Sequence, residues 1–181
     1  MTEKKLGAIH YNWPDYDLEG FAARASEIGY RYCELQINDI WDGRSRDGEK
    51  TAEETRRLLE KYGMQAAAVA AGNDFLQADP TALAAQIERY RYVCQIIPHV
   101  GTDIVRSDGG WNRDDQVPED QWDSMMLEAF KRCADFLELQ TAGRWRLELH
   151  RDQSPTRRVC RRFGNWHQRD YLFGRRVQWP R

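Results

Sequence analysis

The sequence predicts an α/β protein with a parallel sheet, and three observations support this fold class. Short apolar segments alternate with longer segments of helical periodicity. Strand starts fall near residues 5, 32, 64, 102 and 144, so each interval holds one strand and one helix. This repeat is typical of parallel sheets with right-handed crossovers. The 181-residue chain is long enough for one domain with its own core.

The expected strands are short and mostly apolar, and they cover residues 5–10, 32–37, 64–71, 102–106 and 144–150. The third is apolar at nearly every position, as expected of a parallel strand covered on both faces. In the fifth, Glu148 and His150 are two residues apart and therefore point to the same face.

The expected helices show amphipathic patterns and cover residues 17–28, 51–62, 79–97 and 118–138. Asp17 is a suitable N-cap for the first helix. The second opens with Thr51 and Glu54, which form the capping-box pattern. Pro98 and Gly101 are expected to end the third helix.

Strict alternation suits a closed (β/α) barrel as well as an open sheet. The sequence has no GxGxxG after the first strand and no P-loop pattern, which disfavours a nucleotide-binding fold. A barrel of eight units needs roughly 250 residues. We therefore expect a partial (β/α)₈ barrel over residues 1–150, with about four βα units plus a fifth strand. Residues 151–181 read as an irregular Arg-rich C-terminal tail.

Charge is distributed unevenly along the chain. Residues 1–138 carry a net charge of −10 and residues 139–181 a net charge of +8, giving −2 overall. The four cysteines are far apart and form no CxxC pair, which favours reduced thiols in a cytoplasmic protein. The sequence contains no apolar run of signal-peptide or membrane-spanning length.

Polar and aromatic residues recur where the expected strands end. Ligands of parallel βα arrays bind at this edge of the sheet. The candidate substrate-binding residues are His10, Trp13, Glu34, Asn73, Asp74, Arg106, Asp108 and His150, and the candidate catalytic and metal-binding residue is Glu148.

Each candidate also has a purely structural interpretation. Glu148 and His150 can share a metal or pass a proton, but they can equally be a strand-end carboxylate and a solvated imidazole. Arg106 can hold a phosphate or a substrate oxygen, or it can pair with Asp103 or Asp108. The remaining polar residues can act in turns, where Asn73-Asp74 and Gly109-Gly110 are common types.

A resemblance to a known family follows from five motifs. They are KLGAIHY, CELQI, AAGNDF, DIVRSDGGW and RLELH, in this order over residues 4–150. Together they resemble the sugar phosphate isomerase/epimerase family, whose members are xylose isomerase-like TIM barrels.

The resemblance implies metal-assisted proton transfer next to a carbonyl of a sugar or polyol. It implies a divalent metal (Mn²⁺, Mg²⁺, Co²⁺ or Zn²⁺), with Glu148 as ligand and acid/base. His150 matches the family's E-N-H pattern, with Leu149 in place of the usual polar residue. The ligands that the family draws from strands six to eight have no counterpart here, so we expect impaired activity. A homo-oligomer is a further expectation.

The tail leaves three interpretations open: a truncated or out-of-frame product, which we favour, a basic tail for nucleic acid, and a half-barrel whose tail packs in a dimer. Two alternatives to a sugar isomerase also remain. One is a non-catalytic fragment or binding module that acts through the tail. The other is a relative of abasic-site endonucleases, which is disfavoured because the third strand ends in Asn73-Asp74 instead of the histidines that those enzymes use early in the chain.

Overall fold

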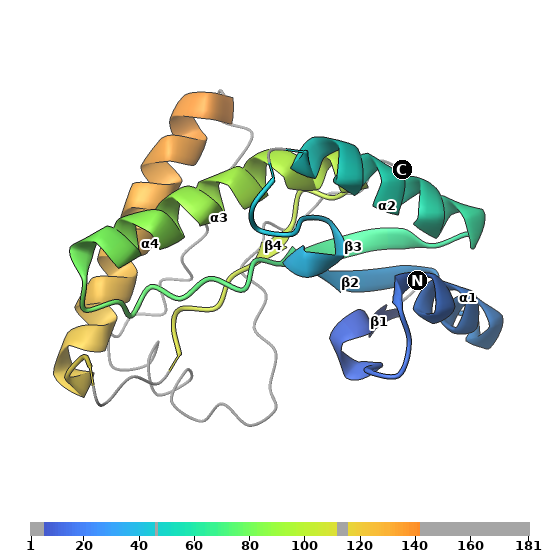
Figure 1. Cartoon of the computed structure of the whole chain (residues 1–181), viewed down its shortest axis with the longest axis horizontal. Coiled ribbons are helices and arrows are strands. Elements are labelled where there is room, and N and C mark those ends of the chain that lie inside the picture. The colour runs from blue at the N-terminus through green and yellow to red at the C-terminus, as the bar shows by residue number, and fades with distance from the viewer. Residues whose placement is uncertain (1–5, 46, 112–115, 142–181) are drawn as a thin grey trace, which may run out of the picture. The chain divides into compact units, whose positions relative to one another are not determined.

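The computed structural model describes residues 6–45, 47–111 and 116–141 (Figure 1). The chain forms two compact units. The first unit comprises Met1–Gly72 and Val93–Arg106, and the second comprises Asn73–Tyr92 and Ser107–Arg181. The expected fifth strand, with Glu148 and His150, and the expected tail lie outside the described residues.

The first unit contains a four-stranded parallel sheet. Its strands are β1 (Gly7–Ile9), β2 (Tyr32–Gln36), β3 (Gln65–Ala70) and β4 (Val105–Arg106), side by side in chain order. Consecutive parallel neighbours of this kind form the wall of a (β/α) barrel. The predicted fold class is therefore confirmed as an α/β protein consistent with a partial TIM barrel.

The pairing register assigns side chains to the two faces of the sheet. Glu34 pairs with Ala68, and Gln36 pairs with Ala70, which in turn pairs with Arg106. Paired positions share a face, so these five residues lie together on what we call the inner face. The opposite face carries the almost fully buried side chains of Cys33, Leu35, Val69 and Val105.

One extra residue interrupts the pairing of β3 with β2. Ala67 lies between the partners of Cys33 and Glu34 and has no partner of its own in β2. Such an insertion shifts the alternation of side chains by one residue. The hydroxyl of Thr102 donates to the carbonyl oxygen of Ala67 at 2.9 Å, which satisfies this irregular part of the strand.

The first helix forms as predicted. Helix α1 (Leu18–Ile28) begins after Asp17, whose carboxylate accepts the N–H of Gly20 at 2.7 Å. It ends at Gly29, where φ is 107° and the missing Cβ removes the penalty of the left-handed conformation. Its buried side chains are Phe21, Ala22 and Ala25. Ile28, the last residue of the helix, is 54% exposed.

The second helix begins earlier than predicted, and its expected capping box is wrong. Helix α2 (Gly48–Lys61) starts three residues before Thr51. The Thr51 hydroxyl donates to the backbone carbonyl oxygen of Asp47 at 2.9 Å, which is the i−4 bond of a threonine inside a helix. α2 packs against α1 and β3 within the first unit.

The third helix passes the proline that was expected to end it. Helix α3 (Pro80–Val100) contains Pro98 in its last turn. A proline near the end removes only one backbone donor, and the N–H of Gly101 closes the turn on the Pro98 carbonyl oxygen at 3.1 Å. Gly101 has a φ of 96° and ends the helix.

The second unit is built around Phe75. Its ring lies 5.8 Å from that of Tyr90 in α3 and 5.1 Å from that of Phe130 in α4 (Glu119–Thr141). Within α4, the predicted apolar stripe is buried at Met126, Ala129, Phe130 and Cys133. None of the helices within the described residues has the length and apolar character needed to cross a membrane.

Candidate functional site

An ion pair lies on the inner face of the sheet, where the strands end. The Nε of Arg106 donates to Oε1 of Glu34 at 2.8 Å, and the two side chains are 18% and 14% exposed. Both residues are predicted site residues, and the structure brings them together. The sequence suggested Asp103 or Asp108 as the ion-pair partner of Arg106, and the structure shows a pair with Glu34.

The small side chains of β3 allow this pair to form. Glu34 is on β2 and Arg106 is on β4, and β3 lies between these strands. Two strand spacings amount to roughly 9.5 Å, which a carboxylate and a guanidinium can bridge only if nothing large stands between them. β3 presents Ala68 and Ala70 there, and these are paired with Glu34 and with Arg106. The sequence of β3 thus determines how the two charged groups meet.

A second charged contact joins the chain segments that follow β1 and β2. The Nδ1 of His10 lies 2.9 Å from Oδ1 of Asp39, and its Nε2 lies 3.1 Å from the carbonyl oxygen of Tyr16. His10 belongs to the short helix η1 (His10–Asn12), and Asp39 to η2 (Ile37–Asp39). The two ring nitrogens of His10 are therefore both engaged within the first unit.

Aromatic rings cluster around the end of β1. The Trp13 ring lies 5.5 Å from Phe21 and 5.6 Å from Tyr16, both in edge-on geometry, and His10 lies 4.9 Å from Phe21. Tyr11 is 74% exposed. Trp13 thus packs against Tyr16 and Phe21. A contact of Trp13 with a sugar stays a prediction.

The second unit contains a buried polar cluster of other predicted residues. The side-chain amide of Asn73 donates to the carbonyl oxygen of Asp108, and its own oxygen accepts the Ser107 hydroxyl at 3.0 Å. Asn73, Asp74, Ser107 and Asp108 are each at most 5% exposed. The structure therefore brings Asn73 and Asp108 together, as their positions at the ends of successive strands suggested.

The carboxylate of Asp74 organises the glycine-containing loop of the same unit. Its Oδ1 accepts the backbone N–H of Leu76 at 3.1 Å and of Trp111 at 3.2 Å. One carboxylate oxygen thereby holds both the residue after Phe75 and the residue after Gly110.

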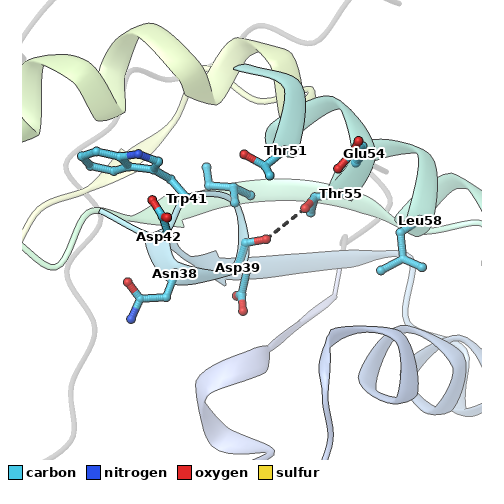
Figure 2. A pocket seen from close by; sticks show the side chains of 9 residues that line it. Asn38, Asp39, Trp41, Asp42, Thr51, Glu54, Thr55 and Leu58 are labelled. Carbon is cyan, nitrogen blue, oxygen red and sulfur yellow. Dashed lines mark hydrogen bonds between the residues drawn. The ribbon is translucent and has the colours of Figure 1, made fainter. Parts of the chain in front are cut away.

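The first unit also has an open cavity of about 470 Å³ between the loop after β2 and α2. Figure 2 shows its lining, with the hydroxyl of Thr55 donating to the Asp39 carbonyl oxygen at 2.9 Å. The lining residues are Asn38, Asp39, Ile40, Trp41, Asp42, Thr51, Glu54, Thr55 and Leu58. No local sequence pattern indicates this contact between the loop and α2, because it depends on the path of the chain between them.

The family resemblance implies a metal, and the described residues alone do not form its site. No three His, Cys, Asp or Glu side chains gather in a metal-binding arrangement within residues 6–45, 47–111 and 116–141. The carboxylate of Asp39 binds His10 and the backbone N–H of Gln36, while Glu34 binds Arg106. The predicted metal ligand Glu148 lies outside the described residues.

Comparison with known proteins connects this architecture to a family. Residues 22–164 match the model of the xylose isomerase-like TIM barrel family. The chain belongs to this family. The match confirms the resemblance drawn from the motifs. No curated protein matches the chain.

Solved structures of similar fold include sugar epimerases and isomerases. A D-psicose 3-epimerase in the presence of D-fructose has a TM-score of 0.58 at 13% identity, covering 74% of this chain and 48% of its own. D-Psicose 3-epimerase with D-tagatose from Clostridium cellulolyticum H10 has a TM-score of 0.60 at 11% identity, and the alignment covers 75% of this chain and 49% of the epimerase. A sugar phosphate isomerase/epimerase from Parabacteroides distasonis ATCC 8503 has a TM-score of 0.54 at 13% identity, and the alignment covers 77% of this chain and 49% of that protein. This xylose isomerase-like chain spans about half the length of these proteins, and the likeness shows their fold.

Proposed function

We propose that this chain contributes the first half of the site of a sugar isomerase or epimerase that moves a proton next to a carbonyl. Family membership supports the reaction class. The observation that carries the proposal is the Glu34–Arg106 pair on the inner face, where the strands of a TIM barrel present their substrate-binding groups. A partly buried guanidinium with a fixed orientation is suited to bind the oxygens of a sugar.

In this proposal, Glu34 orients Arg106 and Arg106 binds substrate. The carboxylate fixes the plane of the guanidinium through Nε at 2.8 Å. The bond to Glu34 uses Nε, one of the nitrogens that carry the five N–H donors of a guanidinium. A sugar carbonyl or hydroxyl oxygen is an acceptor for such donors. Trp13, Asn73, Asp74 and Asp108 remain proposed substrate contacts on the same ground of strand-end position.

The proton-transfer chemistry is assigned to residues beyond the described part. We assign Glu148 as the acid/base and as a ligand of a divalent metal, with His150 beside it as a substrate-binding group. A bound divalent ion would polarise the carbonyl oxygen of the sugar. Glu148 would take and return the proton next to that carbonyl.

Ketose turnover is the direct test of this function. The full chain is incubated separately with Mn²⁺, Mg²⁺, Co²⁺ or Zn²⁺ and with D-psicose, D-fructose or D-tagatose, the sugars named for two of the similar solved structures. The expected result is metal-dependent conversion of at least one sugar into its isomer or epimer. Absence of conversion for every combination would contradict the proposal for this chain.

Replacing Arg106 tests whether the pair belongs to the site. Arg106→Met is expected to lower kcat/KM by about tenfold or more, because a charged hydrogen bond to substrate is lost. Arg24→Met is a matched control, because Arg24 pairs with Glu27 at 2.9 Å on the exposed side of α1. Equal activity of the Arg106 and Arg24 variants would remove Arg106 from the site.

Metal affinity tests Glu148 independently of turnover. Calorimetric titration of Mn²⁺ into the full chain is compared with titration into Glu148→Ala. The expected result is weaker binding by the variant, on the order of tenfold or more, because a carboxylate ligand is removed. Identical titrations would take Glu148 out of the metal site while leaving the fold assignment intact.

A further inference from the structure

We propose that Asp39, which the sequence did not single out, is a positioning residue that fixes the carboxyl ends of β1 and β2. The inference rests on the proposed function, because those ends carry Glu34 and the substrate-facing inner face. The contacts themselves are independent of any substrate.

The two oxygens of the Asp39 carboxylate bind different segments. Oδ1 accepts from Nδ1 of His10, which follows β1, at 2.9 Å. Oδ2 accepts the backbone N–H of Gln36, the last residue of β2, at 2.7 Å. The side chains of His10 and Asp39 are only 14% and 12% exposed, so solvent competes little for these bonds. One carboxylate thereby joins the ends of two neighbouring strands.

The backbone of Asp39 extends this connection to α2. Its carbonyl oxygen accepts the Thr55 hydroxyl at 2.9 Å, as Figure 2 shows. Its backbone N–H donates to the side chain of Gln36, which completes a reciprocal capping box around η2. Asp39 is therefore bonded to the segments after β1 and β2 and to the helix that follows them.

Both ring nitrogens of His10 face protein oxygens. Nδ1 lies 2.9 Å from the Asp39 carboxylate and Nε2 lies 3.1 Å from the Tyr16 carbonyl oxygen. A neutral imidazole carries a single N–H and the carboxylate is the stronger acceptor, so in the neutral ring Nδ1 donates to Asp39. Protein oxygens therefore occupy the hydrogen-bonding directions of both nitrogens. This assigns His10 a positioning role in place of the substrate contact expected from the sequence.

Two substitutions of Asp39 separate positioning from simple stability. Asp39→Asn can keep every contact if the new amide N–H donates to Nδ1 of a neutral His10 and the amide oxygen accepts from Gln36. Asp39→Ala removes both acceptors. The asparagine variant is thus expected to keep the contacts of residue 39 with His10 and Gln36 while the hydrogen bond to Nδ1 changes direction. The alanine variant is expected to lose both contacts.

Proton–nitrogen NMR of the ¹⁵N-labelled full chain at about pH 8 measures these outcomes. We expect hydrogen on Nδ1 of His10 in the wild type and a bare Nδ1 in Asp39→Asn. Asp42→Asn is the control, because Asp42 binds the N–H groups of Arg44 and Ser45 in its own loop, and it should leave the His10 tautomer unchanged. A bare Nδ1 in the wild type would overturn the assignment.

The Nε–H signal of Arg106 reports whether Asp39 positions the proposed site. We expect this signal to shift in Asp39→Ala and to keep its wild-type position in Asp39→Asn. An unshifted Arg106 signal in Asp39→Ala would overturn the positioning role. Where ketose turnover is observed, Asp39→Ala should lower kcat by up to about 100-fold and Asp39→Asn should restore most of it. If the wild type converts no ketose, the proposed function fails while the NMR result still decides the role of Asp39.

Discussion

At the scale of single residues, Gly110 lies too close to Leu76 to accept a larger residue without a shift. A Cβ added there would lie 2.5 Å from Cγ of Leu76 and 2.9 Å from its Cδ1. Gly109 has a similar constraint, because its Cβ would lie 2.5 Å from Sδ of Met126. The glycine pair is therefore needed for close packing within the second unit, a reason that differs from the turn considered from the sequence.

We predict that Gly110→Ala destabilises the protein by about 1–3 kcal/mol, because Leu76 must leave its rotamer or the loop must move. Gly109→Ala should cost less, since the methionine side chain is flexible. Urea unfolding measures both. The double variant Gly110→Ala/Leu76→Ala should be more stable than the sum of the single effects predicts. Strict additivity would show that the contact is not the cause.

Two buried thiols make stability depend on alkaline pH. Burial raises the pKa of Cys33 to about 12, and the negative charge of Asp39 adds to the effect. Burial likewise raises the pKa of Cys133 to about 12. A raised folded-state pKa gives stability that is complete below the unfolded value and is lost as pH rises toward the folded value.

We therefore predict that the free energy of unfolding falls from about pH 8.5 upward, where unfolded thiols begin to ionise. Urea unfolding between about pH 7 and pH 10 measures the slope. Cys33→Ala should show a shallower alkaline slope than the wild type, although its stability at neutral pH is lower. Equal slopes in the two proteins would exclude Cys33 as a source of the dependence.

At the scale of elements, the caps of α1 determine where that helix begins and ends. Asp17→Ala removes the acceptor of the Gly20 N–H and should cost about 1 kcal/mol, whereas Asp17→Asn should cost much less. Thermal unfolding of the two variants checks this difference. A loss of the same size in both would point to the charge of Asp17 instead of its cap.

Elements with strong local signals were predictable, and the site contacts were not. Helix α1 begins after Asp17 and ends at Gly29 as expected, because capping depends on a few adjacent residues. The start of α2 was misplaced because Thr51 has the right residue type for a cap but binds Asp47 from inside the helix. Arg106 was a predicted site residue, yet its partner Glu34 lies 72 positions away in sequence, and no local pattern carries that pairing.

At the scale of the whole molecule, the parallel sheet of the first unit should determine the pattern of local stability. β2 and β3 are each bonded on both sides, whereas β1 and β4 each have one described neighbour. We expect the slowest amide exchange in β2 and β3, for example at Val69, whose N–H donates to Ile104 at 3.0 Å. Native-state hydrogen exchange measures this order. Faster exchange in β3 than in β1 would contradict the sheet order.

The unpaired Ala67 has a consequence for how the sequence of β3 tolerates change. The pairs on its two sides use Cys33 and Glu34, which are adjacent in β2, so a strand without Ala67 would pair continuously and still place Ala68 opposite Glu34 and Ala70 opposite Arg106. A single-codon deletion at position 67 should therefore keep the small side chains between the two charges, although it removes the carbonyl oxygen that accepts the Thr102 hydroxyl. Sequence variants that lack this residue should retain the Glu34–Arg106 pair.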